Sequence, residues 1–478
     1  MKFLFYFSVF YTAFALPLDD YINKVDNHYT WYNTNVILEG RALNLHKWSG
    51  YCLNMTSQKW LTENDSSSSI WTHHLVIINP ENIEIKDTGI LFIGGGDNTY
   101  DIPTAKDDHI ILAAELATNT KSTVAILYQI PNQPIVFKED SLQKSRTEDA
   151  VVAFTWDHFL RNPNNSNEWP IRLPMTKAAV RAMDTVQEFT DHRIDKFVVA
   201  GASKRGWATY FVGAIDKRVI AIIPIVMDML NMIPSIHHMY KAYGGWTFAF
   251  KDYWKLGILG KIDSKEMLKL AEIEDPISYV DRYTMPKLIV NAANDEFFMG
   301  DDINYWWDKL SEPKNRLFIQ NADHSLVTGI QEAVPSISKW INRLYNNEKN
   351  ISILWKFDDD YIIAETSETP SKVSLWYAKT CNNKRRDFRI FNLDNPCTCG
   401  LKYDKYCTNL RVLWNRKDIK ITNNNYWNET IEEDKNKWTA FFLEFNYDGL
   451  DLTTGLNIIP NTFPYEDCCG ESCNGVLV

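Results

Sequence analysis

Short runs of apolar residues alternate with segments of helical periodicity between about residues 70 and 345. The apolar runs are continuous, which is typical of strands that are buried on both faces of a sheet. The segments 175–189 and 330–344 place their apolar residues on one face of a helix, as crossover helices do. This alternation predicts an α/β fold with a doubly wound, mostly parallel sheet. The expected strands are 74–78, 90–93, 123–127, 197–200, 220–226, 287–291 and 316–320.

The interval from about 228 to 283 interrupts this alternation. It is too long for one crossover helix and is rich in Tyr, Trp and Phe. We therefore expect a helical cap that is inserted over the strand ends and shapes a substrate pocket. The alternative is an additional packing layer that has no contact with substrate.

After residue 349 the periodicity changes to two. Alternating runs at 351–357, 372–377 and 438–445 are separated by Asn, Asp, Gly and Pro, which is typical of half-buried strands. We expect a Cys-rich antiparallel β-sandwich domain over 349–478, joined by a linker at 346–350 to an α/β domain over 16–348.

The first 15 residues have one early positive charge, a short apolar run and small residues at Ala13 and Ala15. This arrangement predicts a secretory signal peptide over 1–15. The apolar run is shorter than the roughly 20 residues that span a bilayer, and no later run is longer. We expect a secreted, extracellular protein without membrane insertion.

The cysteines and glycosylation sequons agree with export. Seven of the eight cysteines lie beyond residue 380, and an even number in an exported chain favours disulfides. A four-cysteine zinc site is the alternative, but no histidine follows His324 to complete a mixed site, so we expect no metal. Glycosylation is predicted at Asn54, Asn64, Asn164, Asn350 and Asn428, each of which begins an N-x-S/T sequence.

The balance of charges limits the class of partner. Fifty Lys and Arg against 61 Asp and Glu give a net charge of −11. Because nucleic acids and anionic membranes attract basic surfaces, we expect neither as a partner. A hydrophobic content of 45% over 478 residues is sufficient for about two or three packed domains.

Residues 196–207 read as an apolar strand, a turn of small residues and a helix, with Ser203 in the turn. A serine needs such a sharp turn at a strand end to be exposed as a nucleophile. The usual pattern G-x-S-x-G is not met, because Gly206 stands three residues after Ser203, beyond Lys204 and Arg205. A serine that caps an ordinary helix is the alternative.

A nucleophilic serine in this fold class requires an acid and then a histidine at later strand ends. Asp295 follows the expected strand 287–291, and His324 follows the strand 316–320. We expect Asp295 to orient His324, which would accept the proton of Ser203. Taken singly, each of the two could instead be a turn former or a structural residue. Other candidates are Asp228 and Glu296 for the acid, and His237 and His238 for the base.

An oxyanion hole is expected from a second strand end. Gly94, Gly95 and Gly96 directly follow the strand 90–93, where backbone N–H groups can approach a substrate closely. The N–H of Lys204 would supply a further donor. A phosphate-binding role is disfavoured because neither G-x-G-x-x-G nor a Walker lysine is present.

Short segments spread over nearly the whole mature chain carry a family resemblance. They are MTSQKW (55–60), IGGG (93–96), PNQP (131–134), ED (148–149), LPMTKA (173–178), GASKRGW (201–207), ANDEFF (293–298), ADHS (322–325) and RDFR (386–389). These segments resemble the PhoPQ-activated pathogenicity-related protein family. The resemblance implies an α/β-hydrolase-like fold with Ser203, Asp295 and His324 at its hydrolase-like motifs. It also implies an extracellular signal that restrains cell proliferation, whereas the tail from Cys397 onward matches less well.

Two functions are consistent with these observations. The first is a serine hydrolase that acts on a small ester or peptide, in the manner of a prolyl-oligopeptidase-like exopeptidase, without a cofactor, and that regulates proliferation. The second is a non-catalytic signal that uses the same fold as a scaffold to bind a cell-surface receptor.

Overall fold

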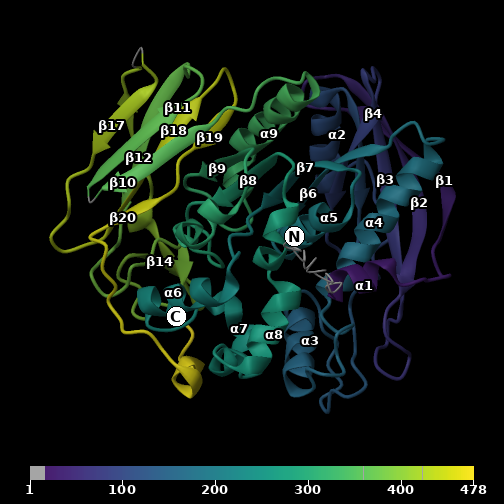
Figure 1. Cartoon of the computed structure of the whole chain (residues 1–478), viewed down its shortest axis with the longest axis horizontal. Coiled ribbons are helices and arrows are strands. Elements are labelled where there is room, and N and C mark those ends of the chain that lie inside the picture. The colour runs from purple at the N-terminus through teal and green to yellow at the C-terminus, as the bar shows by residue number, and fades with distance from the viewer. Residues whose placement is uncertain (1–16, 359, 422–423) are drawn as a thin grey trace, which may run out of the picture.

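The computed structural model describes residues 17–358, 360–421 and 424–478 (Figure 1). The predicted signal peptide at 1–15 lies outside the described residues. Within the described residues, no helix has the length and apolar character that crossing a membrane requires.

The centre of the molecule is a sheet with the strand order β1-β2-β3-β5-β4-β6-β7-β8-β9. The strands from β5 to β9 in this order run parallel, whereas β1, β2 and β3 pair antiparallel at one edge. Their bounds are β1 Thr30–Arg41, β2 Lys47–Lys59, β3 Ile70–Pro80, β4 Ile85–Ile93, β5 Ser122–Leu127, β6 Lys196–Ala202, β7 Val219–Ile225, β8 Lys287–Ala292 and β9 Lys314–Ile319.

The expected strands correspond to β3 through β9, and the predicted fold class is confirmed. The edge strands β1 and β2 were not predicted. Only one residue of β1 is buried, and buried residues in β2 are interspersed with half-buried ones. Neither strand therefore shows the continuous apolar run that marks a doubly covered strand.

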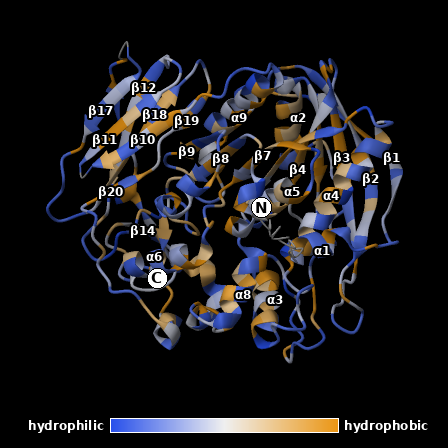
Figure 2. Cartoon of the chain, viewed as in Figure 1, coloured by the Kyte–Doolittle hydropathy of each residue, from blue (hydrophilic) through white to orange (hydrophobic). Residues whose placement is uncertain are grey.

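Helices cover both faces of the sheet, as a doubly wound fold requires. One face carries α2 (Asp108–Thr120) and α9 (Ile330–Tyr345), and the other carries α3 (Asp149–Arg161), α4 (Arg172–Phe189) and α5 (Lys204–Ile215). In Figure 2 the hydrophobic colour recurs on the central strands and alternates with blue around these helices. The short helix α1 (Pro17–Asn23) packs against α4.

The interval between β7 and β8 is helical. It contains α6 (Met232–Tyr243), α7 (Lys251–Lys255) and α8 (Lys265–Glu274), with 3-10 turns at Phe248–Phe250, Leu259–Lys261 and Pro276–Arg282. Helices α7 and α8 lie beside α3 (Figure 1). This is the interval in which we expected a cap.

The C-terminal strands form antiparallel sheets that are separate from the central one. The first is β10-β11-β17, the second is β16-β12-β18-β19 with β20 beside β18, and the third is β13-β15-β14. The rings of Trp427 on β17 and Phe445 on β18 are 5.0 Å apart, so the first two sheets are in contact. The bounds are β10 Ile353–Asp358, β11 Tyr361–Thr366, β12 Lys372–Lys379, β13 Phe391–Asn392, β14 Gly400–Tyr403, β15 Tyr406–Asn409, β16 Asn415–Ile419, β17 Tyr426–Thr430, β18 Thr439–Asn446, β19 Asp451–Thr453 and β20 Asn457–Ile459.

Six cysteines form the disulfides Cys381–Cys399, Cys397–Cys407 and Cys468–Cys473. The prediction of disulfides is thus confirmed for the C-terminal cluster. The even count does not pair completely, because Cys52 is buried in the core and Cys469 is exposed, and both are free.

Candidate active site

Ser203 stands between the end of β6 and the first residue of α5. Its backbone has φ 57° and ψ −126°, a conformation that residues other than glycine rarely adopt. Its N–H donates to the Ile225 carbonyl at 2.8 Å, and its side chain makes no capping hydrogen bond to the helix. The alternative of a serine that caps an ordinary helix is therefore wrong.

Two glycines allow the chain to fold tightly around this serine. A Cβ atom on Gly201 would lie 2.7 Å from the Arg205 carbonyl oxygen, and one on Gly206 would lie 3.0 Å from the Gly201 carbonyl oxygen. Both contacts are with backbone, which cannot move aside cheaply. The second glycine is thus needed at the third position after Ser203, and Arg205 is tolerated at the second.

His324 and Asp295 meet Ser203 at the carboxyl ends of the parallel strands. The Nε2 atom of His324 lies 2.9 Å from Ser203 Oγ, and its Nδ1 atom lies 2.8 and 2.9 Å from the two oxygens of Asp295. The backbone N–H groups of Phe297 and Phe298 donate to Asp295 at 2.7 and 3.2 Å. These donors hold the carboxylate in an orientation that can fix the imidazole.

Burial disfavours the charged form of His324, but the adjacent Asp295 carboxylate outweighs it, and the pKa of His324 is raised above its usual value. Glu296, the rival acid, accepts the backbone N–H of His324 at 2.9 Å. Burial and the charge of Asp295 raise the pKa of Glu296 to about 7. Asp228, the other rival, lies 3.7 Å from the buried guanidinium of Arg316.

The rival bases take part in other contacts. His238 is held between Asp301 and Asp302. His237 on α6 lies 2.8 Å from Asp467 and, on its other side, 2.9 Å from Asp263. Both histidines therefore direct their ring nitrogens at carboxylates and not at Ser203.

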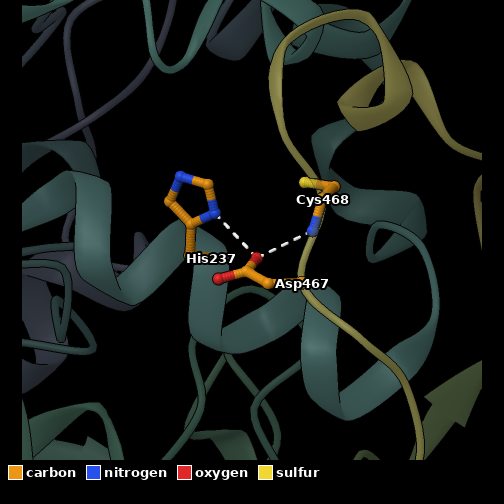
Figure 3. A group of neighbouring side chains, drawn as sticks. All are labelled: His237, Asp467 and Cys468. Atoms are coloured by element: carbon orange, nitrogen blue, oxygen red, sulfur yellow. Dashed lines mark hydrogen bonds and ion pairs between the residues drawn. The ribbon is translucent and has the colours of Figure 1, made fainter.

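His237, Asp467 and Cys468 bring their ligand atoms within 4.8 Å of one another (Figure 3). This spacing alone would suit a metal ion. However, Cys468 is bonded to Cys473, and both ring nitrogens of His237 already face carboxylates. The group instead ties the tail of the chain to α6.

The loop formed by Gly94, Gly95 and Gly96 begins beside the strand that leads to Ser203, because Ile93 at the end of β4 pairs with Gly201 of β6. The N–H of Gly94 donates to the Leu127 carbonyl at 2.7 Å, so this predicted oxyanion donor is already engaged. Within the described residues, the N–H groups of Gly95, Gly96 and Lys204 donate no hydrogen bond.

The basic pair after the serine is largely shielded and paired. The Lys204 ammonium lies 2.8 Å from Glu148 and 3.1 Å from Asp149, and the Arg205 guanidinium also contacts Glu148. Burial opposes ionisation of Glu148, but the charges of Arg205 and Lys204 lower its pKa to about 2. The carboxylates of Glu148 and Asp149 thus neutralise Lys204 and Arg205 locally, and no local sequence pattern indicated these partners.

A cavity of about 40 Å³ is lined in part by Ser203. Arg172 of α4 reaches into its wall, stacks 3.6 Å over the ring of Trp207 and pairs with the buried Glu274 of α8. Sequence reasoning missed this pair, because nothing in the local pattern marks either residue. The other side chains of the wall include Trp156, Met229, Phe250, Tyr253, Ile258 and Phe297.

The five sequon asparagines are accessible to different degrees. Asn64, Asn164 and Asn428 are exposed, and Asn54 and Asn350 are half-buried. Glycosylation at these positions stays a prediction.

The strand order, the helices on both faces and the serine elbow define an α/β-hydrolase-like protein. The chain belongs to the PhoPQ-activated pathogenicity-related protein family, whose model matches residues 18–389. The resemblance noted from its motifs is thereby confirmed. The chain is similar to autocrine proliferation repressor protein A of Dictyostelium discoideum, with 36% identity over 498 residues. The match covers 98% of this chain and 96% of that protein.

Solved structures similar to this chain include two esterases. The acetyl xylan esterase from Paenibacillus sp. R4 has a TM-score of 0.45 at 12% identity and is matched over 68% of this chain and 92% of its own. Acetyl xylan esterase 1 from Thermoanaerobacterium sp. JW/SL YS485 has a TM-score of 0.44 at 14% identity, over 69% and 93%. The fold assignment rests on the strand order itself.

Proposed function

We propose that this protein is a secreted serine hydrolase that transfers an acyl group from a small ester or peptide to water. The observation that carries the proposal is the continuous chain of contacts from Ser203 Oγ through His324 to Asp295, each 2.8 to 2.9 Å long. Contacts of this length suit proton transfer from the hydroxyl to the imidazole.

In the proposed reaction Ser203 Oγ attacks the acyl carbon while His324 takes its proton. Asp295 holds the imidazole in the required orientation and stabilises its charged form. The oxyanion that develops is bound by the N–H of Lys204 with those of Gly95 and Gly96, and the paired N–H of Gly94 fixes the start of their loop. His324 then protonates the leaving group, and water releases the acyl group by the same route. This chemistry needs neither a metal nor an organic cofactor.

A fluorophosphonate probe tests this assignment directly, because it reacts only with an activated serine. We expect the secreted protein to be labelled and Ser203→Ala to lose labelling. The matched control is Ser278→Ala, which removes an exposed hydroxyl bonded only to the Ala271 carbonyl and should label normally. Labelling that persists in Ser203→Ala, or is absent from the wild type, would exclude the hydrolase. An ester series and a series of proline-containing dipeptide amides then separate an esterase from an exopeptidase.

A second candidate is a non-catalytic autocrine signal that restrains proliferation through a cell-surface receptor. The name of the relative from Dictyostelium discoideum and its 36% identity favour a role of this kind. Both candidates act outside the cell, and a hydrolase fold is compatible with either.

The purified protein and Ser203→Ala, added to growing cells, separate the two candidates. Growth restraint that the variant loses supports a signal produced by catalysis. Restraint that the variant retains assigns the signal to binding alone, whether or not the wild type is labelled.

A further inference from the structure

A second cavity, of about 250 Å³, lies between α2 and α9 on the face of the sheet opposite α3, α4 and α5. Its floor is formed by side chains of the central strands, among them Phe92 of β4, Ala202 of β6 and Ile225 of β7. Its walls are Leu112 and Leu116 of α2 and several residues of α9. It is about six times larger than the cavity that Ser203 lines.

The two ends of this cavity differ in what borders them. Near their C-terminal ends the two helices are joined, since the Asn342 amide donates to the Asn119 carbonyl at 3.1 Å. Toward the carboxyl ends of the strands the cavity is bordered by His324, Ser325 and Leu326. Figure 1 shows α2 and α9 neighbouring one another on this face. Ser325 is exposed and His109 is partly exposed at this end, so we place the mouth of the cavity here, next to the histidine that contacts Ser203.

The interior of the cavity offers almost no hydrogen-bonding partner. Its wall is aliphatic or aromatic except for His109, His324 and Ser325. A buried water needs about two to four polar partners, and an apolar cavity of about 150 Å³ stays dry and binds benzene instead. A cavity of 250 Å³ with this wall thus favours an apolar occupant larger than a benzene ring.

We propose that this cavity binds an unbranched aliphatic chain of medium length, with the polar head of the ligand at the mouth beside His109, His324 and Ser325. The residues that line the cavity extend over about two turns of each helix, from His109 to Leu116 on α2 and from Ile330 to Ile337 on α9, and a wall of this extent suits a chain better than a compact ring system. The proposal does not depend on the catalytic role of Ser203, because Ser203 does not line this cavity.

Calorimetric titration of the full-length secreted protein with sodium hexanoate, octanoate and decanoate tests the proposal. We expect saturable binding that tightens about fourfold with each added methylene, as burial of a CH₂ group predicts. Decan-1-ol, titrated in parallel, distinguishes the source of the chain: binding by decanoate alone indicates a free fatty acid, and binding by both indicates an aliphatic chain with any polar head. No saturable binding, or an affinity independent of chain length, would overturn the proposal.

Variants that fill the cavity localise the binding. Ala113→Leu on α2 and Ala333→Leu on α9 each add a branched side chain to the cavity wall, and we expect each to weaken decanoate binding at least tenfold. Because they occupy empty space, they should not lower Tm. Ile111→Leu is the matched control, since this side chain of α2 is 41% exposed and lies outside the cavity. Equal binding by the control and the filled variants would overturn the assignment to this cavity.

Discussion

Ser203 is held in a backbone conformation that costs about 1–3 kcal/mol for a residue with a side chain. The surrounding contacts offset this cost: the N–H of Ser203 is bonded to β7, and the helix begins at the next residue. The same conformation points the hydroxyl at His324 rather than at the helix. The strain at this one residue is thus coupled to the geometry of the proposed chemistry.

At Asp295 we predict a loss of catalysis without a loss of structure. Asp295→Asn keeps a hydrogen-bonding group but favours the wrong tautomer of His324, so hydrolysis should fall about 10⁴-fold. Steady-state kinetics on the best ester or peptide from the substrate series measures this. Glu296→Gln is the control, because the Glu296 carboxylate accepts the backbone N–H of His324 and does not contact its imidazole, so this variant should retain most activity. Equal losses in both variants would contradict the assigned roles.

At His324 we predict the direction of the pH dependence. A general base must be neutral, and the pKa of this imidazole is raised by Asp295. The rate of fluorophosphonate labelling should therefore rise with pH and have its midpoint above 6.5, the usual value for histidine. A midpoint below 6.5, or a flat profile between pH 5 and 9, would contradict the prediction.

The residues of the site were predictable where a rule relates chain order to strand ends. Ser203, Asp295 and His324 each follow a strand, and neighbouring parallel strands bring their carboxyl ends to one edge. The engagement of the Gly94 N–H could not be predicted, because it depends on how β5 lies beside β4. The partners of Lys204 and of Arg172 are more than 50 residues away in sequence, and no local pattern reveals such a pairing.

Among the elements, the buried pair of Arg172 and Glu274 joins α4 to α8. Their side chains are 2% and 0% exposed, and Trp156 also donates to the Glu274 carboxylate at 3.0 Å. When one partner of a buried ion pair is removed, the other charge stays buried without an opposite charge, and the folded state is strongly destabilised. The pair therefore ties the helices inserted after β7 to those that cover the sheet.

We predict that Glu274→Gln lowers the free energy of unfolding by about 3–5 kcal/mol, because it leaves Arg172 charged and unpaired. Urea denaturation measures the change. The double variant Arg172→Met/Glu274→Leu removes both charges and should recover most of the loss. A double variant that is no more stable than Glu274→Gln would show that packing, and not charge pairing, sets the stability here.

The elements that sequence reasoning identified share one property, which is a periodicity imposed by burial. Strands β3 to β9 and helices α4 and α9 are covered by the core, and their apolar residues repeat accordingly. Strand β1 is an edge strand with one covered residue, so its pattern carries no such signal. Edge strands are held by backbone hydrogen bonds, which do not depend on the side chains.

At the scale of the whole molecule, three acidic residues lie where the central fold meets the C-terminal sheets. Glu332 is on α9, Glu444 on β18 and Asp451 on β19. Burial raises the pKa of all three, to about 8 for Glu332 and to about 7 for Glu444, and repulsion from neighbouring carboxylates adds to the rise at Glu332 and Glu444. The folded protein therefore holds protons here that the unfolded chain would release.

The raised pKa of Glu332 fixes the direction in which stability depends on pH. The contribution of protonated Glu332 to the free energy of unfolding is complete below about 4.5, which is the pKa of this residue in the unfolded chain. This contribution is lost as pH rises through about 8, which is its pKa in the folded protein. We predict that Glu332→Gln, which cannot ionise, is more stable than the wild type at pH 8 by about 1–3 kcal/mol but not at pH 5. Urea denaturation at both pH values measures this.

Glu365→Gln, at an exposed position of β11, is the control and should change stability equally little at each pH. A Glu332→Gln variant whose advantage is the same at pH 5 and 8 would contradict the prediction.

The position of Gly206 affects how proteins of this kind can be found. A pattern search for G-x-S-x-G passes over this chain, although its backbone makes the same strand-to-helix turn. The steric requirement falls on whichever residue faces the Gly201 carbonyl, and here that residue is the third after the serine. Genome surveys that allow G-x-S-x-x-G, and that also require an Asp and a His after later strands, would recover serine elbows that the shorter pattern leaves uncounted.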